Sequence, residues 1–123
     1  MIKKEQIDQF ETLQGQLQAL YGEMNTLAKK NPNDALNKFK LELVNYALAK
    51  ANSFLGATRV PFAEFQSFDE STMPSTSDVL MILSQYLSAF EKFRAENIYL
   101  DYLTWYWDGP DKIPTAPPKK LKS

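Results

Sequence analysis

Carboxylates are the side chains of this chain with the widest chemical use, because its 123 residues include no histidine and no cysteine. Histidine is the usual general base near neutral pH and the commonest metal ligand. Cysteine would supply thiolate nucleophiles, disulfides and metal ligands. Ser-His-Asp and Cys-His catalysis are therefore excluded, as are zinc and di-iron sites that need histidine. We expect no catalytic, cofactor-binding or metal-ligating residues.

Two carboxylates held at a fixed separation can hydrolyse a glycosidic bond. The candidate carboxylates lie along the last expected helix and in the connection before it, at Glu91, Glu96, Asp101, Glu64, Asp69 and Glu70. Nothing in the sequence marks a cleft around them, and a run of charges usually forms a solvated face. A small hydrolase that uses carboxylates alone is the least favoured reading, and we expect a protein that is not an enzyme.

A dense aromatic segment lies between residues 99 and 107. Its members are Tyr99, Tyr102, Trp105, Tyr106 and Trp107. Tyrosine and tryptophan are enriched at binding hot spots, since they bury a large area at little rotamer cost. On one continuous helix these rings would point in all directions and could not all enter one small core. We expect them to form a partner-binding surface, the alternative being packing under the neighbouring loop and tail.

A basic tail follows an acidic region. Residues 59–111 hold three basic and nine acidic side chains, a net charge of −6, whereas residues 112–123 hold four lysines and no acid. Three of these lysines complete the expected partner-binding set, namely Lys119, Lys120 and Lys122. Such a tail could dock in an acidic groove or neutralise phosphates. The two arginines, Arg59 and Arg94, lie outside any basic cluster, so nucleic-acid binding is the alternative function and not the first.

Three helices are predicted, over residues 3–30, 34–55 and 76–107. In the first, apolar residues alternate spacings of three and four, as in a helical seam, at Phe10, Leu13, Leu17, Leu20, Met24 and Leu27. The third begins at a capping-box-like Ser75 and ends before Asp108. A break near residues 95–97 is an alternative to one continuous helix.

The second expected helix has two adjoining apolar stripes. One stripe is Leu36, Phe39, Leu43, Ala47 and Phe54, and the other is Leu41, Val44, Leu48, Ala51 and Leu55. A wide apolar face is typical of a central helix with two neighbours. Asn33 is the expected N-cap.

The predicted fold is all-α, an antiparallel three-helix bundle with a long connection between helices two and three and an extended C-terminal tail. We assign residues 1–110 to a single helical domain and residues 111–123 to a Pro/Lys-rich tail, which is expected to be polyproline-like. The long connection, residues 56–74, should pack down through three aromatic side chains, Phe62, Phe65 and Phe68.

The function predicted from these features is a non-enzymatic protein-interaction module that binds another protein or a second copy of itself. Its contact surface would be the aromatic end of the third helix and the adjacent tail. The alternative is a nucleic-acid-associated regulator that uses the basic tail. The first residues carry lysines without an apolar run behind them, and no stretch approaches the ~20 apolar residues of a transmembrane helix. We therefore expect a cytoplasmic protein with no membrane partner.

Overall fold

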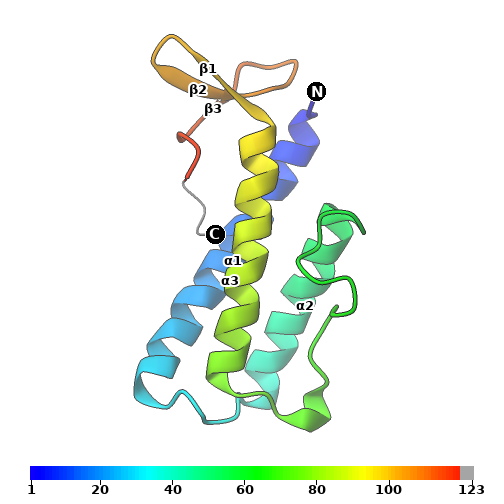
Figure 1. Cartoon of the computed structure of the whole chain (residues 1–123), viewed down its shortest axis with the longest axis vertical. Coiled ribbons are helices and arrows are strands. Elements are labelled where there is room, and N and C mark those ends of the chain that lie inside the picture. Colours follow the sequence, from blue (N-terminus) through cyan, green and yellow to red (C-terminus); the bar gives the residue numbers. More distant parts are fainter. Residues whose placement is uncertain (120–123) are drawn as a thin grey trace.

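The computed structural model describes residues 1–119 and shows an α+β protein, with three long helices followed by a small antiparallel sheet (Figure 1). The helices are α1 (Lys4–Lys30), α2 (Lys38–Leu55) and α3 (Thr76–Glu96), with a short 3-10 helix, η1, at Glu70–Thr72. The strands are β1 (Ile98–Asp101), β2 (Thr104–Trp107) and β3 (Pro114–Thr115). The predicted all-α helical bundle is therefore wrong, because a sheet replaces the end of the expected third helix.

The third helix ends at Glu96 and not at residue 107, which confirms the alternative of a break near residues 95–97. Asn97 ends it by donating its backbone N–H to the carbonyl of Arg94 and its side-chain amide to the carbonyl of Phe93. The residues that follow are mostly aromatic or β-branched, types that favour a pleated strand. This preference outweighs the helical spacing that we assigned to them.

The sheet has the strand order β1-β2-β3, and both pairings are antiparallel. Tyr102 and Leu103 connect β1 to β2 as a two-residue turn. Side chains alternate along a strand, so the register divides the hairpin into two faces. One face carries Ile98, Leu100, Trp105 and Trp107, and the other carries Tyr99, Asp101, Thr104 and Tyr106.

Both α2 and α3 begin at the same end of the molecule and run antiparallel to α1 (Figure 1). There the backbone N–H of Thr76 donates to the carbonyl of Asp34 at 2.9 Å. The long connection, residues 56–74, must therefore return along α2. Asn45 fastens it, since its side chain donates to the carbonyl of Phe68 and accepts from the N–H of the same residue, at 3.0 and 2.9 Å.

Two of the three phenylalanines predicted to pack under this connection do so. Phe65 and Phe68 are half-buried against the core, with ring centroids 5.0 Å apart. Phe62 is exposed, so its predicted burial is wrong.

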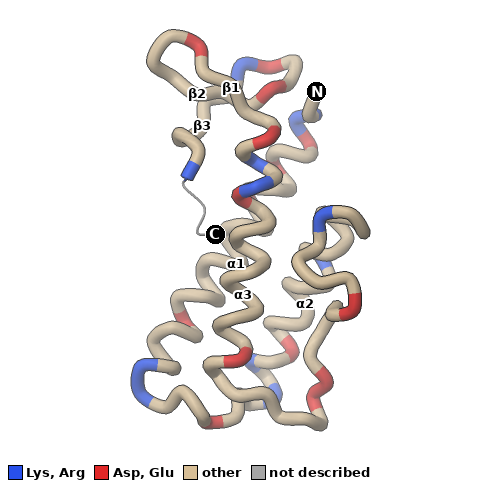
Figure 2. Tube along the Cα trace, viewed as in Figure 1, with Lys and Arg blue, Asp and Glu red and all other residues tan. Residues whose placement is uncertain are grey.

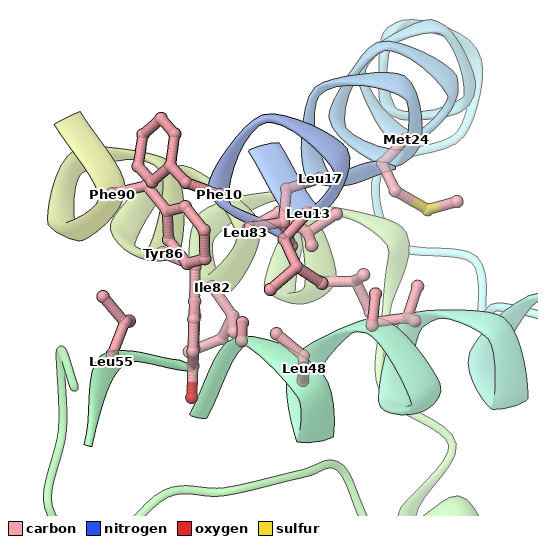
Figure 3. Packing of buried hydrophobic residues seen from close by; sticks show 14 of the residues in the cluster. Phe10, Leu13, Leu17, Met24, Leu48, Leu55, Ile82, Leu83, Tyr86 and Phe90 are labelled. Atoms are coloured by element: carbon pink, nitrogen blue, oxygen red, sulfur yellow. The ribbon is translucent and has the colours of Figure 1, made fainter. Parts of the chain in front are cut away.

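The predicted apolar seam of α1 is confirmed as an intramolecular contact. Phe10, Leu13, Leu17 and Met24 are buried, and Leu20 and Leu27 are partly buried. Figure 3 shows Phe10, Leu13 and Leu17 on the side of α1 that faces α2 and α3, with Phe90 and Tyr86 of α3 beside Phe10. The most extensive helix contact is between α1 and α3.

Helix α2 departs from its prediction in two ways. It begins at Lys38, and its N-cap is Asn37 and not Asn33, because the side chain of Asn37 accepts from the N–H of Lys40 at 2.8 Å. Only the second predicted stripe is fully buried. From the first stripe, Phe39 and Leu43 are 69% and 45% exposed, since α1 and α3 pack chiefly on each other and leave α2 to one side (Figure 1).

Candidate functional site

The turn between β1 and β2 presents the two most exposed large apolar side chains of the described residues. Tyr102 is 92% exposed and Leu103 is 97% exposed. The turn lies at the far end of a hairpin that extends beyond α3 (Figure 1). No part of residues 1–119 covers this apolar pair, so both side chains lie in water. Exposed apolar side chains that lie together are a common feature of interaction sites.

The backbone of this turn is strained. Tyr102 has a φ of 56°, in the left-handed region that glycine and asparagine favour over large side chains. Two-residue hairpin turns usually place glycine or asparagine at such positions. Tyr102 is therefore an exposed side chain on a backbone conformation that large side chains disfavour.

The two faces of the hairpin differ in chemistry. On one face Leu100 is exposed and lies opposite Trp105, which is half-buried. On the other, Tyr99 and Tyr106 pair with ring centroids 5.9 Å apart. Lys112, from the loop after β2, lies with its Nζ 4.8 Å from the centre of the Tyr106 ring.

Lys112 also ties the loop after β2 to the end of β1. Its Nζ donates to Oδ2 of Asp101 at 2.6 Å. This hydrogen bond and the negative charge of the Asp101 carboxylate raise the pKa of the Lys112 ammonium above its ordinary value. The pair is exposed, so water screens it and its contribution to stability is small.

Trp107 does not belong to this surface. Its side chain is 1% exposed and packs edge-on against Phe10 with ring centroids 5.1 Å apart. It is the point where β2 joins the helical core. The indole Nε1 is buried and has no hydrogen-bond partner among the described residues, although buried donors are usually paired.

Lys119, the one predicted tail lysine within the described residues, lies apart from the hairpin tip. From β3 the chain turns back along the helices and away from the tip (Figure 1). Lys119 has an exposed side chain, and its backbone N–H donates to Oε2 of Glu91 at 3.3 Å. Lys120 and Lys122 lie outside the described residues. The structure thus places Tyr99, Tyr102, Trp105 and Tyr106 on the partly or wholly exposed part of one hairpin. Trp107 belongs to the same hairpin but is buried in the core, and Lys119 lies away from the hairpin beside Glu91.

Two residues that hold the tail were missed. Arg94 and Glu91 of α3 form a buried ion pair that bonds to residues 115–119. The sequence shows Arg94 as an isolated cation and Glu91 as one of several helix carboxylates. Their spacing of three residues is that of a helical ion pair, and this is the one signal that could have linked them.

Most of the carboxylates considered for catalysis form an ion pair or a hydrogen bond within the chain. Arg59 bonds to Glu96, Arg94 to Glu91 and Lys112 to Asp101. Asp69 caps η1 by accepting from Ser71, and this bond lowers the pKa of the Asp69 carboxyl. Within residues 1–119, no three Asp or Glu side chains gather as ligands for a metal ion.

Most charged residues of α3 gather near its C-terminal end, where acidic and basic side chains lie close together (Figure 2). A second group of exposed apolar residues lies on the outer side of α2, where Phe39, Leu43 and Tyr46 follow helical spacing. Lys50, one turn further on, places its Nζ 4.5 Å from the centre of the Tyr46 ring. This stripe lies on regular helix without backbone strain.

Comparisons of the chain with protein-family models, with curated proteins and with solved structures return no match. In the part of the chain that is described, none of the helices has the length and apolar content needed to cross a membrane.

Proposed function

We propose that this chain is a non-enzymatic protein-interaction module whose contact surface is the tip of the β1–β2 hairpin. The observation that carries the proposal is the exposure of Tyr102 and Leu103, at 92% and 97%, on a turn where Tyr102 has a positive φ. The fold would be served better by a polar turn. A partner that buries the two side chains would recover the hydrophobic free energy that the free protein forgoes.

The neighbouring side chains support a contact with a protein. Leu100 and Tyr99 extend the apolar tip along β1, which is an edge strand of the sheet. Tyrosine is a preferred hot-spot residue, because its ring packs on apolar surface while its hydroxyl stays hydrogen-bonded. The tip would enter an apolar pocket on another protein or on a second copy of the chain. A contact made by the few side chains of one hairpin tip is small. It belongs to the class of transient interfaces that bury less than about 1,200 Å².

The proposal is tested by placing a charge at the tip. In Leu103→Asp the carboxylate would have to be buried in the partner's apolar pocket, which is unfavourable. The variant should keep the circular dichroism of the wild type and lose either its partner in pull-downs from the native host or its self-association in sedimentation equilibrium. Met81→Asp is the matched control, because Met81 is 59% exposed on α3. If Leu103→Asp associates as the wild type does, the tip is not the contact surface.

A nucleic-acid role for the tail lysines stays the alternative and gives a different result. Binding would weaken steeply with salt and would be unaffected by Leu103→Asp.

A cytoplasmic location also stays part of the proposal. The cysteine-free composition is compatible with a reducing compartment, and fractionation of the native host would test the location.

A further inference from the structure

The outer face of α2 is apolar and exposed. Phe39, Leu43 and Tyr46 are 69%, 45% and 61% exposed there, while the opposite side of the helix packs on the core. Helix α2 lies at the side of the molecule (Figure 1), and no other helix covers this face within residues 1–119. Large apolar side chains that recur at spacings of four and three are typical of a helix that packs on another helix. The face is therefore suited to a second helix.

The two halves of this face differ in the size of their side chains. An α-helix turns by about 100° per residue, so residues three and seven positions from Tyr46 lie within about 60° of it around the axis. On the N-terminal side these positions hold two large side chains, Phe39 and Leu43. On the C-terminal side they hold two small and exposed residues, Ala49 and Ser53. The face is thus raised at one end and low at the other.

This difference in size favours an antiparallel pairing of two copies of α2. When the pair is centred on Tyr46, Phe39 lies at the level of the partner's Ser53. Leu43 then lies at the level of the partner's Ala49. Each large side chain meets a small one, as close packing requires. A parallel pairing would instead set Phe39 against Phe39 and leave a gap at the small end.

A hollow beside Ser53 has room for the incoming ring. It lies between α1 and α2 and has a volume of about 390 Å³. Its lining residues come from both helices and include Lys50, Ser53, Asp8, Thr12 and Leu13. The ring of the partner's Phe39 would contact Leu13 and the aliphatic stem of Lys50 there. The hollow lies at the end of the face where the antiparallel pairing places this ring.

The charges on this face are complementary to themselves in the same orientation. Glu42 and Lys50 are exposed and lie four residues before and after Tyr46. Among the described residues, neither belongs to an ion pair. In the antiparallel pair Glu42 lies at the level of the partner's Lys50, and twofold symmetry gives this contact twice. A parallel pair would set like charges side by side, which is unfavourable. A second copy of the chain is therefore the partner whose charges fit.

The segments beside α2 leave this face free. On one flank, Asn45 and Asn52 hold the long connection by donating to its backbone carbonyls. On the other flank, Lys40 is paired with Glu23 of α1 at 3.3 Å. These three positions of α2 lie about 100–120° from Tyr46 around the helix axis. A partner helix can therefore approach Tyr46 between them.

We propose that a second copy of the chain docks on the outer face of α2 as an antiparallel helix pair centred on Tyr46, with Phe39 of each copy in the hollow beside Ser53 of the other. The contact is separate from the hairpin tip and does not rest on the function proposed for it. The hairpin lies beyond the C-terminal end of α2 (Figure 1), so the two tips of such a dimer point in opposite directions. A contact made by one helix face is small compared with a standard interface of about 1,600 Å², so we expect a dissociation constant in the micromolar range.

The first experiment exchanges the charges and measures the oligomeric state by sedimentation equilibrium. All chains carry Leu103→Asp, which removes association through the hairpin tip. The tip is in turn tested in Glu42→Lys, so the two proposals fail separately. The parent chain should dimerise, whereas Glu42→Lys and Lys50→Glu should each associate at least about tenfold more weakly, because each sets like charges at the same level.

An equal mixture of these two variants should regain the affinity of the parent chain, because each supplies the charge that the other needs. Recovery supports the pairing of Glu42 with the partner's Lys50. A parent chain that stays monomeric at millimolar concentration would overturn the proposal. So would single variants that associate as the parent does, or a mixture that associates no better than its components.

The second experiment tests the fit of Phe39. Ser53→Trp fills the hollow and should weaken the dimer at least about tenfold, although it adds apolar surface. Met81→Trp is the matched control, because it adds a tryptophan at an exposed position of α3 and should leave the affinity unchanged. Circular dichroism checks that both variants keep the fold. If Ser53→Trp dimerises as tightly as the parent chain or more tightly, the ring of Phe39 does not enter the hollow and the antiparallel pairing is wrong.

Discussion

In the helical body, Phe10, Phe54, Phe90 and Phe93 pack together with ring centroids 5.0 to 6.0 Å apart. In the C-terminal sheet, which is equally rich in aromatic residues, only Trp107 joins that cluster. The other rings of the sheet stay partly or wholly in solvent, because a three-stranded sheet attached at the end of α3 has no second layer to cover it (Figure 1). The position of an aromatic residue in the fold, and not its type, decides whether its ring is buried or exposed.

The two tryptophans of β2 give the largest test of this contrast. Trp107→Ala should destabilise the protein by about 3–5 kcal/mol, because it leaves a cavity beside Phe10. Trp105→Ala should lower the free energy of unfolding by about 1 kcal/mol or less, because its side chain is half in water. Urea denaturation of both variants measures the difference. Similar values for the two would show that β2 is not attached to the core as described.

The ion pair that holds the tail gives the next effect. Arg94→Met leaves Glu91 as an uncompensated buried charge, so it should lower the free energy of unfolding by about 3–5 kcal/mol at pH 7. Replacing both partners, Glu91→Leu with Arg94→Met, should recover much of this loss while releasing residues 115–119. Hydrogen exchange of the Lys119 amide reports the release. A double variant that is as unstable as the single one would contradict this account of the pair.

The strained turn predicts a smaller effect of opposite sign. Tyr102→Asn should raise the free energy of unfolding by up to about 1 kcal/mol, since asparagine tolerates the left-handed region better than tyrosine. The same change should weaken partner binding. Leu103→Asn is the control for strain, because the φ of Leu103 is not positive. The stability of this variant should stay close to that of the wild type. Loss of stability in Tyr102→Asn would mean that the tyrosine serves the fold.

The smallest effect lies in the helical body and depends on pH. Burial raises the pKa of the Tyr86 phenol above its ordinary value of 10.0, and the hydroxyl donates to Oδ1 of Asn52 on α2, toward which it points in Figure 3. Above pH 10 the unfolded chain loses this proton while the folded chain keeps it, so stability falls as the pH rises. In Tyr86→Phe this part of the fall should be absent. Thermal unfolding of both proteins between pH 8 and about 11 measures it, and identical slopes would contradict the shift.

The helices were predictable from the sequence because their signals are local. The period of the apolar residues located α1, and Ser75 is confirmed as the N-cap of α3. The sheet was missed because Tyr102-Leu103 resembles no common turn pair. The apolar residues around it also fit helical spacing as well as strand alternation.

The ion pair that holds the tail was beyond reach of the sequence for a different reason. Arg94 bonds to residues 21 to 23 positions later in the chain, and no local pattern links residues so far apart. The exposure of Phe39 and Leu43 has a similar origin. It follows from how α1 and α3 pack on each other, which the apolar stripes of α2 do not encode.

The most direct test of the central claim is site-specific photocrosslinking from the hairpin tip. Because the chain has no cysteine, Leu103→Cys and Met81→Cys can each carry one benzophenone group, at the tip and at the control position on α3. The account predicts that irradiation in an extract of the native host gives one major protein adduct, or a covalent dimer, from position 103 and not from position 81. Equal adducts from both positions, or none from position 103, would contradict it.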